Sequence, residues 1–179
     1  GSRSILGDPR DVEMQKKMNL KIKFRESFRP FAPAILAADA PKYFDIRDDS
    51  PYMLMVSPVL ESIRTKRAPG EEGGLGSINE VRSEFPAITH VDYSARVQTV
   101  NEQNNRPFTL LLESFKAQTG CPILVNTSFN VRGEPIVQSP EEAYRCFMRT
   151  HMDVLVLGSY VLQRTVQPPF IEETDWRDE

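Results

Sequence analysis

The chain has 179 residues, a net charge of −3, and 40% hydrophobic against 26% charged residues, the size and balance of one ordinary globular domain. No apolar run reaches the roughly 18 residues of a membrane-spanning helix, and the start, GSRSILGDPR, lacks the apolar stretch of a secretory signal. Two cysteines, Cys121 and Cys146, and two histidines are too few for a disulfide framework or a close-spaced zinc cluster. We therefore expect a soluble, cytoplasmic protein without a metal site.

Charge is unevenly distributed along the chain. Residues 1–29 hold eight Lys or Arg against four Asp or Glu, whereas the last fifteen residues, TVQPPFIEETDWRDE, hold five acids and one arginine. Two prolines interrupt that final stretch, so we expect residues 165–179 to form an acidic tail outside a domain that spans 1–164. The basic N-terminal part is therefore where a partner anion is expected to bind.

The first half of the chain predicts a helix followed by loops and strands. Asp8 and Pro9 favour a helix over about 9–20, with Asp8 as its N-cap. Prolines limit the stretch 21–36 to irregular structure or an edge strand until about Ala34. A short helical turn at 39–45, a buried strand at 52–56 and a mobile glycine-rich loop or lid at 64–80 follow, with a plain connector as the alternative for the last.

The second half alternates strands and helices. We expect strands at 87–91 and 95–100, an amphipathic helix at 107–120 that ends at Gly120, an apolar strand from 122, a helix capped by SPEE at 139–142, and two strands within 152–164. This order favours crossover connections and an α/β or α+β domain, with one twisted mixed sheet and flanking helices.

The first candidate for chemistry is a basic cluster in residues 21–29. Lys23 and Arg25 share a face if the segment is extended, and Arg29 follows. Guanidinium groups bind phosphate in a bidentate manner and lysine adds a point charge, so the cluster suits a di- or triphosphate. The alternative is a solvated basic edge that deters strand pairing.

Two further clusters lie at strand ends. Arg96 is the only charged residue between Asp92 and Glu102, so it implies a protein carboxylate or a ligand anion as partner, whereas His90 is interpreted as structural. In NTSFNVRG, the small polar residues and the amides near Gly133 suit an anion nest, with a simple asparagine-rich turn as the alternative. No GxxxxGK[ST] phosphate loop occurs in the sequence.

Long phrases in the chain resemble a known family, the O-carbamoyltransferases of nodulation-factor and antibiotic biosynthesis, in their C-terminal, YrdC-like domain. The resemblance rests on GSRSILGDPRD (1–11), KIKFRESFRPFAPAIL (21–36), HVDYSARVQTV (90–100), TGCPILVNTSFNVRGEPIV (119–137) and DVLVLG (153–158). The family's FGPRALG phrase, with its arginine, would precede residue 1. Tyr93 stands where the family pattern has a glycine.

The resemblance implies a YrdC-like fold and an ATP-dependent carbamoyltransferase that uses carbamoyl phosphate. A carbamoyl-adenylate would form at this domain with ATP and Mg²⁺, and an N-terminal domain of the same polypeptide, which holds the family's metal, would pass the carbamoyl group to a substrate hydroxyl. That domain is absent from this chain. Formation of a homodimer is one possibility, and neither a membrane nor a nucleic acid is an expected partner.

The same resemblance implies roles for individual residues. Lys23, Arg29, Arg96 and Ser128 match positions that hold carbamoyl phosphate and nucleotide phosphates, and Lys23→Ala is expected to weaken ligand binding without harming the fold. Arg25 and Asn130 are expected as ligand-binding neighbours in the same pocket. Asn105, Asn126 and Arg132 are weaker matches for ligand binding, with a positioning or structural role as the alternative.

Two other functions remain open at this point. The domain alone could be an inert receptor for a nucleotide and carbamoyl phosphate, or an RNA-associated relative of the same fold. The RNA alternative is disfavoured because the pI is about 5.5 and the basic patch is small.

Overall fold

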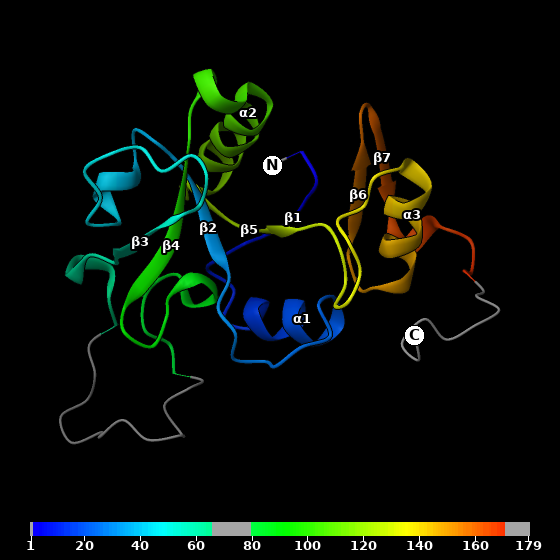
Figure 1. Cartoon of the computed structure of the whole chain (residues 1–179), viewed down its shortest axis with the longest axis horizontal. Coiled ribbons are helices and arrows are strands. Elements are labelled where there is room, and N and C mark those ends of the chain that lie inside the picture. The colour runs from blue at the N-terminus through cyan, green and yellow to red at the C-terminus, as the bar shows by residue number, and fades with distance from the viewer. Residues whose placement is uncertain (1, 66–79, 171–179) are drawn as a thin grey trace.

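A five-stranded mixed sheet forms the centre of the molecule (Figure 1). The structure is a computed structural model that describes residues 2–65 and 80–170. The sheet has the order β1-β5-β2-β4-β3, and only β2 and β4 are parallel neighbours. Its strands are β1 (Ser4–Gly7), β2 (Ala32–Leu36), β3 (Met55–Pro58), β4 (Ser94–Val100) and β5 (Ile123–Ser128).

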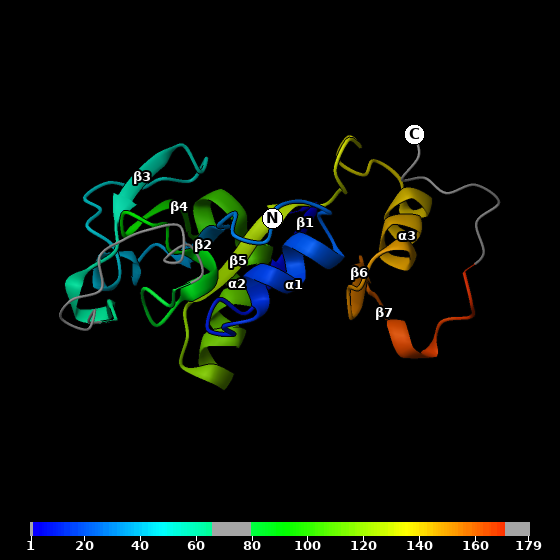
Figure 2. The ribbon, with the colours of Figure 1, turned by 90° about the horizontal axis from the view of Figure 1, so that it is seen from below.

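Three helices and a hairpin surround this sheet. They are α1 (Met14–Lys21), α2 (Glu102–Thr119), α3 (Pro140–Arg149) and the antiparallel pair β6 (Val154–Leu157) and β7 (Tyr160–Gln163). In Figures 1 and 2, α3 and the β6–β7 hairpin lie together at one end of the molecule, and β3 lies at the other. The expected α/β fold is confirmed, but the hairpin is a sheet of its own, so the expectation of one sheet was wrong.

Two apolar clusters cover the two faces of the sheet because side chains alternate along each strand. The larger cluster joins Ile35 of β2 and Ile123 of β5 to Met18 of α1 and to Phe147 of α3. The smaller cluster packs residues of the opposite face against α2, and it consists of Ala34, Leu36, Val100, Phe108, Leu112 and Leu124. On that second face the apolar cover includes the carboxyl ends of β2 and β4. The residues before Ala34 on β2 and before Val100 on β4 lie outside this apolar cluster.

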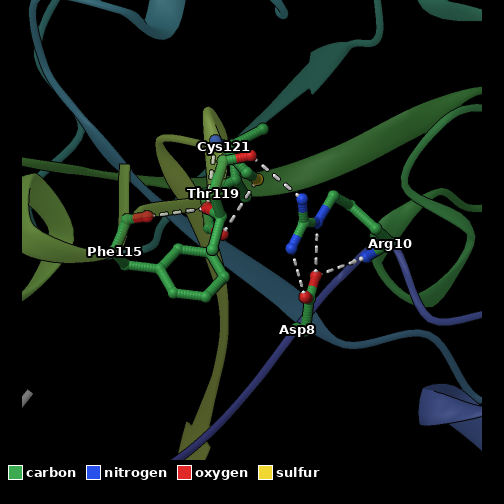
Figure 3. Close-up of polar contacts among 6 residues, drawn as sticks. Asp8, Arg10, Phe115, Thr119 and Cys121 are labelled. Carbon is green, nitrogen blue, oxygen red and sulfur yellow. Dashed lines mark hydrogen bonds and ion pairs between the residues drawn. The ribbon is translucent and has the colours of Figure 1, made fainter. Parts of the chain in front are cut away.

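The first helix begins later than expected. It starts at Met14, and its N-cap residue Glu13 makes no side-chain capping bond. Asp8 instead accepts hydrogen bonds from the backbone and guanidinium of Arg10, which also donates to the carbonyl of Thr119 at 3.2 Å and lies over the ring of Phe115 (Figure 3). The aspartate therefore holds the N-terminal segment against the end of α2 rather than capping a helix.

The environments of two early strands differ from the expectation. Residues 32–36 form a central strand with Pro33 inside it, and the parallel pairing with β4 begins only at Ala34, after the residue that lacks an N–H. The strand expected as buried at 52–56 lies at 55–58 on the sheet edge, where Met55 is 60% exposed. An apolar run alone could not distinguish a central strand from this edge strand.

The later elements are mostly confirmed. Gly120 ends α2 with a φ of 75°, Ser139 caps α3 by accepting from the Glu142 amide, and Cys146 is buried. However, 87–91 forms only a 3₁₀ turn at Pro86–Ile88, and α2 begins at Glu102.

Of the two expected crossover connections, the one from β4 through α2 to β5 is confirmed and the one from β5 to β6 was wrong. The strands β4 and β5 are separated by β2, which is parallel to β4 and antiparallel to β5. The strands β5 and β6 belong to different sheets. Most of the glycine-rich stretch and the end of the acidic tail, residues 66–79 and 171–179, lie outside the described residues. In the described part of the chain, every helix is too short or too polar to cross a membrane.

Candidate anion-binding site

A polar cavity of about 600 Å³ lies on the sheet beside the area that α2 covers. Its floor comes from β2, β4 and β5, and its walls come from the 25–31 loop, the 51–53 turn and the start of the chain. A smaller cavity of about 280 Å³ adjoins it and shares four lining residues with it, namely Arg25, Arg29, Thr127 and Ser128. Together the two cavities bring segments far apart in sequence to one place.

Small residues on β2 make room for this floor. Ala32 pairs with Asn126 of β5, and Ala34 pairs with Gln98 of β4. The Asn126 amide donates to the Gln98 side-chain oxygen at 2.7 Å, so the two polar side chains meet above the alanine strand. Larger side chains on β2 would fill that space, and the sequence APAIL therefore permits a polar floor on a central strand.

Lys23 is buried between the loop after α1 and the end of β5, with 5% of its surface exposed. Its Nζ donates to the carbonyl and side-chain oxygens of Ser128 and of Asn130, the latter at 2.9 and 2.8 Å. All these acceptors are neutral. Burial, with a smaller contribution from Arg25, lowers the pKa of Lys23 to about 8. Lys23 is therefore part of the fold as well as of the cavity wall, which argues against the expectation that Lys23→Ala spares the fold.

The loop that carries these cations is shaped by Asn19, which sequence reasoning missed. Asn19 is fully buried at the end of α1, and its amide donates to the carbonyls of Ser27 and Arg29 at 3.0 and 2.7 Å. Its side-chain oxygen accepts from Arg25 Nε at 2.6 Å. Phe24 has a φ of 48°, so Lys23 and Arg25 do not form the extended face that was expected. The asparagine instead folds the loop back on itself.

The guanidinium group of Arg25 lies over an aromatic ring. The guanidinium carbon lies 4.6 Å from the centre of the Phe31 ring, and burial, together with nearby Arg29, lowers the pKa of Arg25. No partner is recorded for its two terminal nitrogens within the described residues. These nitrogens form the fork that binds phosphate in a bidentate manner.

Arg29 and Arg96 line the same cavity and are exposed. Within the described residues the Arg29 guanidinium has one carboxylate partner, Glu26 at 4.0 Å, and both side chains of that pair are more than half exposed. Arg96 lies on β4 opposite Val56 of the edge strand, and it has no ion pair within the described part of the chain. The sequence implied either a protein carboxylate or a ligand anion as the partner of Arg96. Because the described residues supply no carboxylate, a ligand anion is the remaining candidate among them.

The third sequence cluster closes the smaller cavity. Ser128 donates to the Asn130 side-chain oxygen at 2.7 Å, and the Asn130 amide donates to the carbonyl of Glu134 at 2.7 Å. Arg132 lines the cavity beside Gly133, whose φ of 84° is the left-handed conformation that glycine adopts readily. Serine and asparagine therefore position Lys23 and the turn, and Arg132 adds a further exposed cation.

Asn105 lies elsewhere. It has non-helical backbone angles inside α2, where its side chain accepts from the amide of Phe108, so it caps the part of the helix that begins at Arg106. It lines neither cavity. His90 is half-buried, burial lowers its pKa, and its amide donates to the Ser94 carbonyl, which agrees with a structural role. Tyr93, at the position of the family glycine, has a φ of 62°.

Arg3 was also missed. It precedes β1 and lines the larger cavity, where its guanidinium donates to the carbonyl of Val137 at 3.1 Å. The pairing of Ser4 with Ser128 brings it to the end of β5. The sequence showed a basic N-terminal region but could not show this register.

The electrostatics of the site follow from its lining. The two cavities are lined by Arg3, Lys23, Arg25, Arg29, Arg96 and Arg132, and by one carboxylate, that of the exposed Glu26. Apart from the long contact between Arg29 and Glu26, these cations have no carboxylate partner within the described residues, and a group of this kind favours a bound polyanion. In the described residues no group of three or more His, Cys, Asp or Glu side chains is arranged to hold a metal. The structure is thus an α/β domain with a polar cavity whose cationic lining suits a phosphate-type anion.

Comparison with known proteins gives the family. The sequence pattern of the family described as carbamoyltransferase C-terminus matches residues 1–164, so the chain belongs to this family. It is 40% identical to the nodulation protein NolNO of Sinorhizobium fredii over 98% of the chain and 23% of that protein. It is 37% identical to the 3'-hydroxymethylcephem-O-carbamoyltransferase of Amycolatopsis lactamdurans over 91% of the chain and 27% of that enzyme.

A further relative is an uncharacterized protein of Synechocystis sp., which is 55% identical over all of the chain and 29% of its own length. The chain therefore spans about a quarter of the length of these relatives. Most of the length of each relative therefore lies outside the part that matches this chain.

Proposed function

We propose that the chain is the part of an ATP-dependent O-carbamoyltransferase that binds carbamoyl phosphate and ATP and forms carbamoyl-adenylate. The observation that carries this proposal is the group of six cations around the polar sheet floor, whose lining contains one carboxylate, that of Glu26, together with membership of the carbamoyltransferase family. The carbamoyl group is then passed to a substrate hydroxyl in an N-terminal domain of the same polypeptide.

The chemistry needs cations more than it needs a nucleophilic side chain. Water hydrolyses carbamoyl phosphate to carbamate and inorganic phosphate. A carbamate oxygen then attacks the α-phosphorus of ATP, and pyrophosphate leaves. Bringing these anions together is opposed by charge repulsion, and positioned cations offset that repulsion and stabilise the transferring phosphoryl group. Mg²⁺ bound to the triphosphate of ATP would offset part of its negative charge.

Each residue has a role in this proposal. Arg25, stacked on Phe31, and exposed Arg96 bind phosphate oxygens, and Arg29 completes the cationic wall. Lys23 keeps Ser128 and Asn130 in place and adds positive charge behind them. Asn126 and Gln98 offer amide groups on the floor, which suit the carbamoyl amide.

The experiment that tests the proposal is calorimetric titration of this chain with carbamoyl phosphate and with ATP plus Mg²⁺. Binding of both is expected, followed by release of phosphate and pyrophosphate when both ligands are present. Binding without pyrophosphate release would favour the inert receptor, and binding of neither ligand would overturn the proposal. RNA binding that weakens with salt, in place of nucleotide binding, would favour the RNA alternative.

A further inference from the structure

One wall of the larger cavity is apolar and aromatic. It consists of Pro51, Tyr52 and Met53 with Ile136, and it faces the same space as the arginines. Tyr52 is 81% exposed, and its side chain has no recorded partner within the described residues. A large aromatic side chain in this position adds nothing to the core and is free to contact a ligand in the cavity.

The turn that carries Tyr52 is firmly attached to β4. Ser50 is 4% exposed, its amide donates to Thr99 Oγ1 at 2.7 Å, and its hydroxyl donates to the Val97 carbonyl at 2.9 Å. The Thr99 amide donates a hydrogen bond to the Ser50 carbonyl at 3.0 Å. Gln98, which forms part of the cavity floor, donates to the carbonyl of Pro51 at 3.1 Å. The turn is therefore tied to the strand that also carries Arg96.

The backbone at this turn is strained. Met53 has a φ of 57°, which is the left-handed region that a residue with a side chain adopts at a cost of about 1–2 kcal/mol. Strain of this kind is found where function requires a particular backbone shape. Here the turn holds an exposed ring at the edge of a cationic cavity, and its four hydrogen bonds to β4 keep it there.

We propose that Tyr52 is the stacking surface for the base of the bound nucleotide. The inference rests on the proposed function, because the phosphates of that nucleotide lie on the arginines of the same cavity. A nucleobase has a flat, apolar face that stacks on tyrosine, and such stacking contributes about 1–3 kcal/mol per base. The two kinds of cavity wall thus match the two halves of a nucleotide, cationic for phosphates and aromatic for the base.

The test compares ATP with tripolyphosphate, which has the phosphates but no base. We expect Tyr52→Ala to weaken ATP binding about 10-fold or more while tripolyphosphate binding changes less than about twofold. Tyr52→Phe keeps the ring and should bind ATP as the parent does. Tyr160→Ala is the matched control, since Tyr160 is 75% exposed on the distant β6–β7 hairpin.

The outcomes separate this inference from the proposed function. If Tyr52→Ala binds ATP as tightly as the parent, the stacking role is wrong and the phosphate site stands. If Tyr52→Ala loses ATP and tripolyphosphate equally, Tyr52 acts on the shape of the cavity, which also overturns the inference. If the parent binds neither ligand, the proposed function fails and the inference fails with it.

Discussion

The Nζ of Lys23 donates to the side-chain oxygen of Asn130 at 2.8 Å, across more than one hundred residues of sequence. This bond and its neighbours tie the loop after α1 to the end of β5, and they place a buried cation behind the candidate site. Because the acceptors are neutral, the charge is stabilised by dipoles alone and burial lowers the pKa of the amine to about 8. Lys23 therefore links folding, anion binding and pH.

The first prediction is that ATP affinity falls as pH rises from 7.5 to 9.5. In the protein without ligand, Lys23 loses its proton near pH 8. A bound anion favours the charged amine, so ATP binding above pH 8 is accompanied by uptake of a proton by Lys23. ATP itself is fully ionised in this range. Titration at pH 8.5 in two buffers of different ionisation enthalpy measures the proton uptake. Uptake near zero at pH 8.5 would contradict the prediction.

The same pKa has a consequence for stability. The folded-state pKa of Lys23, about 8, lies below its ordinary value of 10.5, so between these values the unfolded chain binds more protons than the folded one. Stability therefore gains from Lys23 as pH rises through that window, and the charged amine costs stability below it.

Local sequence signals predicted the helices and their ends well, but they predicted poorly which strands lie side by side in the sheet. Ser139, Gly120 and the spacing of α2 predicted helix ends because caps depend on a few adjacent residues. The position of β2 between β4 and β5 depends on pairing between distant segments, and Pro33 gave a misleading signal of an edge strand. The same limit applies to the buried strand expected at 52–56.

The candidate site divides in the same way. Arginines 25, 29 and 96 were predicted from their charge and from the resemblance, and the structure places all three on one cavity. Asn19 and Gln98 were missed because an asparagine on a helix and a glutamine on a strand carry no distinctive pattern, and their roles come from hydrogen bonds to other segments. Asn105 matched the family but lies in a helix kink.

A second prediction concerns Asp39, whose side chain is 5% exposed and accepts from Lys42 at 2.7 Å and from Lys116 at 2.6 Å. Burial opposes ionisation, but the hydrogen bonds of the two lysines outweigh it and keep the pKa below its ordinary value of 3.8. Asp39 therefore contributes stability above that value, which is lost as pH falls through the folded-state pKa. Asp39→Asn should lower stability at pH 7 by about 1–2 kcal/mol.

The measurement is urea unfolding of both proteins from pH 7 to pH 3. The difference between the parent and Asp39→Asn should shrink at the acidic end, because the parent loses its ion pairs there. A difference that stays constant over the whole range would show that the carboxylate charge is not what stabilises the fold.

A third prediction tests the end of α2. Gly120 has a φ of 75°, and a Cβ added there would meet nothing within 4 Å, so the cost of Gly120→Ala is conformational rather than steric with neighbours. We expect a loss of about 1–2 kcal/mol in the free energy of unfolding. Gly120→Asn should recover part of the loss, since asparagine tolerates the left-handed region. Equal stability of Gly120→Ala and the parent would contradict the assigned backbone conformation.

A fourth prediction concerns Arg96, which is exposed, lines the larger cavity and has no ion pair in the described part of the chain. Its removal leaves no buried partner unsatisfied, so Arg96→Ala should fold as the parent does. Loss of one charged hydrogen bond to phosphate costs about 1.5–3 kcal/mol, which is roughly a 10- to 150-fold loss of affinity.

Calorimetric titration with ATP plus Mg²⁺ measures that loss. The matched control is Arg47→Ala, because Arg47 is also exposed but lines neither cavity of the candidate site. Both variants lower the net charge of the protein by the same amount, so the comparison separates the effect of net charge from that of a charge at the cavity. Equal weakening by the two variants would mean that Arg96 attracts the anion from a distance without binding it, and the phosphates would then have to lie on Arg25 and Arg29.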